Sequence, residues 1–219
     1  MRDALLLLII GGGSLYALKH AWVGVILWTW ISLMNPHQFG WITGSLPVAM
    51  SVAACTLIGF LVARDKQNPF VAPPVMALLI FTLWMCVTLP FSFDVTDSVW
   101  LWQRSMKIFL MIFVTIALLT DKRKLDIFVG VATLSIAFYG IKGGVFTLAT
   151  GGAYRVWGPG GFIEGNNEIA LALVMTIPLL RYMQQQVTRR WLKQAFGVAM
   201  LLTAITVLCL LYTSPSPRD

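Results

Sequence analysis

The stretch PPVMALLIFTLWMCVTLP, from Pro73 to Pro90, contains no charged side chain. A run of roughly 17–25 mainly apolar residues is long enough to cross the hydrocarbon core of a bilayer as an α-helix. The regular apolar–polar alternation of a transmembrane β-strand is absent from it. The stretch therefore predicts a membrane-spanning helix, and the same pattern recurs along the chain.

Seven further apolar runs accompany this one and predict an all-α fold, a polytopic transmembrane bundle of about eight helices. A short polar loop on the outer face separates the sixth helix from the seventh. The first two runs are short for a full crossing and leave open a shallow hairpin, and Pro178 predicts a kink in the seventh. The predicted spans are Ala4–Leu18, Ala21–Met34, Gly44–Ala63, Pro73–Pro90, Ser105–Thr120, Asp126–Ala149, Glu168–Met183 and Ala195–Leu211.

The composition supports the lipid bilayer as the main partner of the chain. Hydrophobic residues make up 58% of the sequence and charged residues only 11%, against about 25% charged in soluble domains. The net charge of +7 comes from basic residues in short loops between apolar runs rather than from a separate basic domain. This distribution argues against nucleic acid as a partner. The three cysteines lie inside apolar runs without metal-ligand spacing, and we expect neither a metal nor a cofactor.

The same basic residues predict the orientation of the helices. Basic clusters follow the third, fifth and seventh runs, and positively charged loops stay in the cytoplasm. The N-terminus and the loops after the second, fourth and sixth runs then face outward. The localisation predicted from this pattern is a multi-pass protein of the cell membrane. The basic clusters are Arg64 with Lys66, Lys122–Lys124, and Arg189–Arg190 with Lys193.

The C-terminal residues CLLYTSPSPRD (Cys209–Asp219) break the apolar pattern of the eighth run. One set of codons for them matches a transposase adapter used in shotgun sequencing. We therefore expect residues 209–219 to be translated adapter, and residues 1–208 to be a single membrane domain truncated near Leu208.

A polar island, YRVWGPGGFIEGNNEIA (Tyr154–Ala170), interrupts the apolar pattern between the sixth and seventh runs. Its Arg155 and the cations Arg104, Lys107 and Lys142 lie on the predicted outer side, where basic residues are uncommon. Together they predict a cationic pocket for a phosphate or pyrophosphate group. Two alternatives remain open. In the first, the cations pair with nearby carboxylates; in the second, the side chain of Lys142 extends to the membrane surface. The carboxylates are Asp94, Asp97, Glu164 and Glu168.

Asn166 and Asn167 precede the seventh run and predict an asparagine cap on that helix, with Glu168 favourably placed in its first turn. A helix N-terminus that faces a cavity is also an anion site. His37, in the outer loop MNPHQFGW, is a candidate general base, although a lone histidine at an interface is more often simply solvated.

The island and the residues that follow it, RVWGPGGFIEGNNEIALALVMTIPLL, resemble the motif of the O-antigen ligase and polymerase superfamily. Asn166 stands where many relatives have proline. SLMNPHQFGW (Ser32–Trp41) and YGIKGGVFTLATGGAYRVWGPGGFIEGNNE resemble the O-glycosylation ligase family associated with the exosortase A system, and the likeness covers Met1–Leu208. The motif positions are occupied by Arg155, Gly158, Gly161, Phe162, Asn167, Ala170 and Pro178.

The resemblance implies an inner-membrane enzyme of Gram-negative bacteria that needs no metal. It would pass a glycan from an undecaprenyl-diphosphate carrier to a lipid or protein acceptor at the periplasmic face. Substrate binding would fall to Arg155, Lys142, Arg104 and Lys107, with Asn166 and Asn167 shaping the start of a helix. In the family the catalytic base is a histidine in a later periplasmic loop, so the fragment alone should be inactive. A glycan polymerase of the same superfamily and a non-catalytic transport or assembly subunit are the alternatives.

Overall fold

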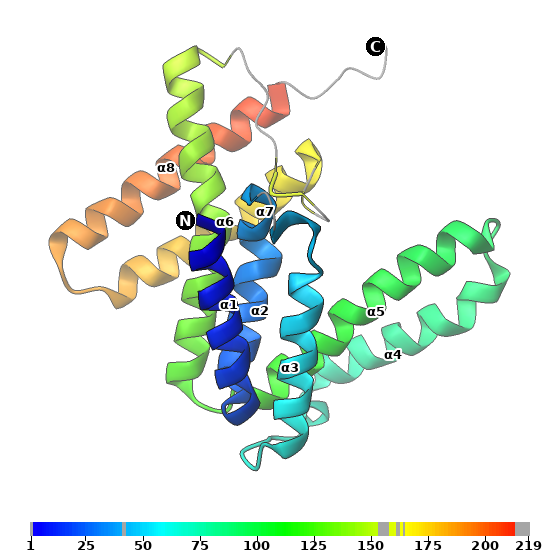
Figure 1. Ribbon diagram of the computed structural model, residues 1–219. Coiled ribbons are helices and arrows are strands. Elements are labelled where there is room, and N and C mark those ends of the chain that lie inside the picture. The colour runs from blue at the N-terminus through cyan, green and yellow to red at the C-terminus, as the bar shows by residue number, and fades with distance from the viewer. Residues whose placement is uncertain (1, 41–42, 153–157, 161–162, 164, 213–219) are drawn as a thin grey trace. The chain divides into compact units, whose positions relative to one another are not determined.

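The computed structural model describes residues 2–40, 43–152, 158–160, 163 and 165–212 (Figure 1). Within these residues the chain forms eight α-helices and four short 3-10 helices, which confirms the all-α fold. The α-helices are α1 (Arg2–Lys19), α2 (Ala21–Met34), α3 (Val48–Val62), α4 (Pro73–Thr88), α5 (Val95–Leu118), α6 (Lys122–Thr150), α7 (Asn166–Gln186) and α8 (Arg190–Tyr212). The 3-10 helices are η1 (Pro36–Phe39), η2 (Thr43–Ser45), η3 (Pro69–Val71) and η4 (Leu89–Phe91).

Four segments of the described chain are helical, long and apolar enough to cross a membrane. The chain is therefore a membrane protein by the length and composition of its helices. Helices α2 and α3 are apolar but shorter; at 1.5 Å per residue the 14 residues of α2 span about 21 Å. The long segments are Pro73–Phe91, Val95–Leu118, Lys122–Thr150 and Arg190–Leu210.

Helix α5 begins ten residues earlier than the sequence predicted, at Val95 rather than Ser105. The cause is a helix cap at Asp94, a residue predicted to lie in an outer loop. The side chain of Asp94 accepts hydrogen bonds from the backbone N–H groups of Thr96 (2.9 Å) and Asp97 (3.2 Å). These bonds satisfy two of the free N–H groups at the helix start. The polar residues between Phe91 and Ser105 therefore form the first turns of a helix rather than a loop.

The chain divides into two compact units, and the first contains residues 1–28 and 46–125. In this unit α1 and α3 pack backbone to backbone: a Cβ on Gly59 would collide with the carbonyl oxygen of Ala17. Gln67, in the loop after α3, donates its backbone N–H to the Ala117 carbonyl (3.1 Å) and its Nε2 to the Ile116 carbonyl (2.8 Å). The end of α5 is thereby tied to the loop that follows α3.

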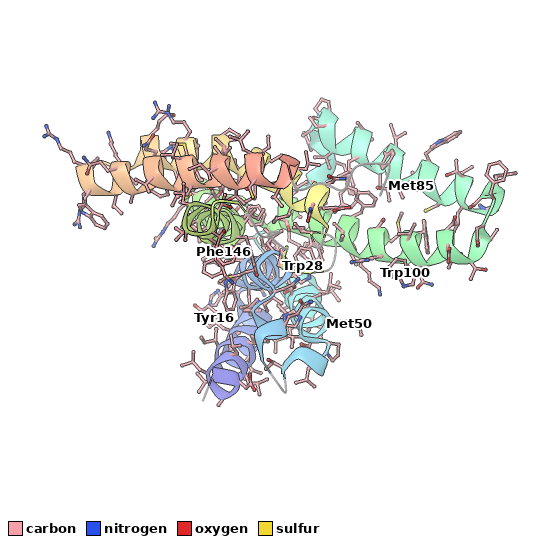
Figure 2. All side chains as sticks on the ribbon, turned by 90° about the horizontal axis from the view of Figure 1, so that it is seen from above. Tyr16, Trp28, Met50, Met85, Trp100 and Phe146 are labelled. Atoms are coloured by element: carbon pink, nitrogen blue, oxygen red, sulfur yellow. The ribbon has the colours of Figure 1, made fainter. Side chains whose placement is uncertain are left out.

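Helices α4 and α5 form an antiparallel hairpin within the first unit (Figure 1). The rings of Phe81 and Phe109 meet edge to face, with centroids 6.2 Å apart. Val75 is the buried residue of α4 within the described chain, so most of this apolar helix is exposed. Side chains project along both helices of the hairpin, among them Met85 and Trp100 (Figure 2). Such exposure of apolar side chains is unfavourable in water and suits contact with lipid.

The second unit contains residues 29–45 and 126–219, and α6, α7 and α8 form most of it. Helices α7 and α8 run antiparallel (Figure 1). Helix α6 packs against α8 through Gly140 and Gly144, because a Cβ on Gly144 would collide with the backbone of Leu202. The Thr206 hydroxyl also donates to the carbonyl of Gly140 at 2.6 Å. Small residues four apart allow such close approach between membrane helices.

One hydrophobic cluster of the second unit, called here the terminal cluster, joins the end of α2 to α6, α7 and α8. The phenolic O–H of Tyr139 donates to the Met34 carbonyl at 2.6 Å and links α6 to α2. The cluster thus places the C-terminal end of α2 beside the N-terminal end of α7. It consists of Tyr139, Ile169, Ala170, Leu173, Val207 and Leu210, with Met34, Ile136 and Ile163 packed against it.

Candidate functional site

The loop after α2 lies against the glycine-rich segment before α7, although the two are more than 120 residues apart in sequence. Asn35 is 9% exposed, and its Nδ2 donates to the carbonyl oxygens of Pro159 (3.0 Å) and Gly160 (3.4 Å). Its backbone is left-handed, with a φ of 46°, a conformation that asparagine tolerates better than most residues. The Asn35 amide thus provides a hydrogen-bond donor for two carbonyl groups that lie outside any helix.

Gly160 also lies close to Gln38 of this loop. Its φ of 91° is accessible essentially to glycine alone, and a Cβ at this position would come within 2.6 Å of Gln38 Oε1. The backbone N–H of Ile163 donates to the Gly160 carbonyl at 3.4 Å, and Ile163 packs against the terminal cluster. The loop residues 35–38 therefore contact Pro159 and Gly160 directly, and residues 35–38, 158–160, 163 and 165 are called here the motif junction.

The start of α7 differs from the predicted asparagine cap. The N-cap residue is Gly165, and no side chain caps the helix by a hydrogen bond. Asn166 and Asn167 are instead the first two residues of the helix. The carboxylate of Glu168 folds back against Gly165, because a Cβ on this glycine would collide with Glu168 Oε2. Glu168 thus places its negative charge at the positive end of the α7 dipole, as predicted, and in place of an asparagine cap.

Asn166 and Asn167 are adjacent but have opposite environments. Asn166 is only 6% exposed, and neither its Nδ2 nor its Oδ1 has a hydrogen-bond partner within the described structure. Asn167 is exposed. A buried amide without partners is uncommon in folded proteins and needs an explanation. Of the two predicted asparagines, Asn166 is therefore the candidate for binding.

His37 is less solvated than a lone interfacial histidine was expected to be. It is half-buried in η1, and its Nδ1 has no hydrogen-bond partner in the described part of the chain. Burial lowers the pKa of the His37 imidazole below its ordinary value of 6.5. The backbone carbonyl of His37 accepts a hydrogen bond from the Thr43 hydroxyl at 2.9 Å, which orients the loop. A neutral imidazole can donate through one ring nitrogen and accept through the other.

The predicted cations are distributed over both units. Arg104 lies half-buried in α5 with its Cζ 5.1 Å from the ring centroid of Trp100, a cation–π distance, and Lys107 is exposed one turn later. Both lie well inside α5 rather than at its start, because the helix begins at Val95. Lys142 is exposed on α6, between the two glycines that face α8. Arg155 lies outside the described residues, so a common cationic pocket stays a prediction.

The first unit contains an apolar groove of about 470 Å³ between α1 and the start of α3. Its walls include Leu7, Ile10, Val48 and the hydroxyl-bearing Ser14 and Ser51. No lysine, arginine, aspartate or glutamate lines it among the described residues. This groove therefore has no charge to bind a diphosphate and is not the predicted pocket.

Sequence reasoning identified Asn166 but missed Asn35, Gln38 and Tyr139 as parts of the same structure. The available signal was the co-occurrence of MNPHQF and WGPGG in the resemblance, since two motifs of one family often meet in the fold. Their contact depends on the way α2, α6 and α7 pack, which apolar run lengths do not specify.

These features define a polytopic α-helical membrane protein with a polar junction at the ends of α2 and α7. The chain belongs to the family of unknown function DUF5935, whose family model matches residues 1–188. No match was found among the curated proteins or among the solved structures. The match includes both halves of the motif junction.

Proposed function

We propose that this protein is a glycosyltransferase of the O-antigen ligase type in the inner membrane of a bacterium. It transfers a glycan from a polyprenyl-diphosphate carrier to a lipid or protein acceptor at the periplasmic face. The proposal rests on the motif resemblance of residues 32–41 and 139–168, taken together with the packing of the described residues in these two segments.

The observation that supports it best is the motif junction itself. Asn35 binds the carbonyls of Pro159 and Gly160, and Tyr139 binds the carbonyl of Met34. Two motifs that are distant in sequence therefore build one polar structure at the ends of apolar helices. A transferase that uses a membrane-bound carrier needs polar groups near the ends of its membrane helices, where the carrier's head group meets water.

In the proposed site, Arg155 holds the charge of the diphosphate, and Lys142 assists. A guanidinium group binds phosphate oxygens in a bidentate manner and keeps its charge at any physiological pH. Neutralising the leaving diphosphate in this way lowers the barrier for transfer of the glycan without a metal.

The test is the substitution Arg155→Ala in the intact gene, with Arg189→Ala as the matched control. Arg189 is exposed and lies in a loop predicted to be cytoplasmic, so its loss removes a cation from the other side of the membrane. We expect Arg155→Ala to abolish glycan transfer in a deletion strain and to leave the amount of protein in the membrane unchanged. Arg189→Ala should support normal transfer. Full transfer by Arg155→Ala would contradict the proposal.

The glycans left in the deletion strain separate ligase from polymerase. Loss of a ligase leaves carrier-linked glycan without acceptor, whereas loss of a polymerase leaves single repeat units joined to the acceptor. Mass spectrometry of the acceptor fraction distinguishes these results.

A further inference from the structure

The start of α7 presents an unusual combination of groups. Asn166 is buried, with both a donor and an acceptor unpartnered in the described structure, and the Glu168 carboxylate already occupies the helix end beside Gly165. A helix N-terminus is ordinarily a favourable place for an anion, because its N–H groups and dipole are positive. Here the negative charge of Glu168 offsets that field.

A negative charge at this helix end affects charged and neutral ligand groups differently. A diphosphate brought to this helix end would approach a carboxylate of like charge, which raises the free energy of binding. A neutral hydroxyl group meets no such repulsion. The electrostatics of the α7 start therefore favour an uncharged, polar ligand over a phosphate.

The hydrogen-bonding capacity of Asn166 points the same way. Its Nδ2 can donate and its Oδ1 can accept, and a phosphate oxygen can satisfy only the donor. A hydroxyl group both donates and accepts, and neighbouring hydroxyls of a sugar ring match the paired atoms of an amide. A hydroxyl-bearing ligand can therefore satisfy both the Nδ2 and the Oδ1 of Asn166, whereas a phosphate cannot.

A second unpartnered polar atom belongs to the same end of the second unit. Met34 and Ile169 pack in the terminal cluster; His37 follows Met34 by three residues, and Asn166 precedes Ile169 by three. The Nδ1 of His37 also lacks a partner among the described residues. A neutral imidazole suits hydroxyl groups as well, whichever of its nitrogens carries the proton.

We infer that the start of α7 is a glycan subsite in which Asn166 binds sugar hydroxyls, and that the diphosphate of the carrier is bound elsewhere. The inference rests on the proposed function and divides its substrate into two parts. It changes the role of Asn166 from shaping the start of a helix to recognising the sugar. It also predicts that substitutions at Asn166 and Arg155 impair binding of different portions of the same molecule.

The experiment measures binding of two probes to the full-length protein in detergent. One is the polyprenyl-diphosphate-linked glycan extracted from the source strain, and the other is farnesyl diphosphate, which has no sugar. Asn166→Ala should weaken binding of the glycan carrier about tenfold or more, the effect of losing a good polar contact. Its affinity for farnesyl diphosphate should stay within about twofold of the parent. The exposed neighbour gives the matched control, Asn167→Ala, which should change neither affinity.

Glu168→Gln is the second variant and tests the electrostatic argument directly. It removes the negative charge and keeps the shape, so it should leave glycan-carrier binding nearly unchanged. An equal loss of both probes in Asn166→Ala would assign the helix end to the phosphate and overturn the inference. Weaker farnesyl diphosphate binding in Glu168→Gln would overturn it as well, because the carboxylate would then not repel the phosphate. Unchanged binding of both probes by Asn166→Ala would overturn it too. Asn166→Asp, nearly isosteric, shows whether a loss reflects misfolding: an intact elution profile with weakened glycan binding supports the inference.

Failure of the proposed function gives a different result. If the protein is not a glycan transferase, the parent binds neither carrier probe, and Arg155→Ala supports normal glycan transfer. If the subsite alone is wrong, the parent binds both probes and Arg155→Ala weakens both, while the Asn166 variants do not distinguish them.

Discussion

The contact between α6 and α8 offers a sharp test of the packing in the second unit. Gly144→Ala adds one Cβ, which would meet the carbonyl carbon of Leu202 at 2.8 Å and its Cα at 2.9 Å, and would collide with its oxygen. Ordinary contacts of a Cβ begin at 3.4 Å, so relieving the 2.8 Å contact requires the two helices to separate by at least about 0.6 Å. Because the obstructing atoms are backbone, no side-chain rotation relieves the collision.

Gly130 provides a control in the same helix. A Cβ there would meet only the terminal Cε of Met183 at 3.6 Å, an ordinary contact with a flexible side chain. Both substitutions remove a glycine from a helix interior and gain about 1 kcal/mol of helix propensity. This gain cancels when the variants are compared with each other. Overpacking of a tight contact costs about 1–3 kcal/mol, so we expect Gly144→Ala to be less stable than Gly130→Ala by that amount.

The assay is unfolding in mixed micelles with increasing mole fraction of a denaturing detergent, followed by circular dichroism. Gly130→Ala should unfold at the same or a higher fraction than the parent, and Gly144→Ala at a lower one. A difference between the two variants of less than about 0.5 kcal/mol would refute the close approach of α6 to α8, since a real collision exceeds that value.

Three further predictions concern the motif junction and α5. Asn35→Ala should lower stability by about 1–3 kcal/mol, because it leaves the carbonyls of Pro159 and Gly160 without their donor and places alanine in a left-handed conformation. Asn35→Gly relieves only the backbone strain, so it should recover part of that loss in the same unfolding assay. Burial lowers the pKa of His37, so the unfolded chain binds more protons below pH 6.5 and stability should fall as the pH decreases through that range. Thermal unfolding of the parent at pH 7.5 and 5.5, compared with His37→Gln, isolates this contribution; an identical pH dependence in the two proteins contradicts it. Asp94→Ala should lower stability by about 1 kcal/mol by removing the α5 cap, and Asp94→Ser should recover most of it in thermal unfolding; an unchanged melting temperature in Asp94→Ala would contradict the cap.

The helices of this protein follow from apolar run length, and the sequence predicted their number and most of their bounds. The prediction for α2, Ala21–Met34, agrees with the structure at both ends. Run length failed at α5, because the residues from Val95 to Arg104 include several polar side chains and do not form an apolar run. The missed signal was local: Asp94 is a helix-capping residue, and Asp97 lies in the first turn.

The same limits apply to the candidate site. Asn166 was recognisable as a polar residue at a helix start, but the sequence predicted a cap where the structure has a buried, unpartnered amide. Which of two adjacent asparagines is buried depends on the rotation of α7 about its axis, and packing against the terminal cluster sets that rotation. The role of His37 likewise depends on its burial, which a lone histidine in a loop does not reveal.

By itself, the sequence determined that this is an all-α membrane protein with a polar, glycine-rich segment before its seventh helix. Hydrophobicity over consecutive residues is a local property, so it can be read along the chain. Only the tertiary structure decided that Asn35 holds Pro159 and Gly160, and that Gly144 lies against Leu202. These contacts join residues far apart in sequence, and they form because helix packing brings complementary surfaces together.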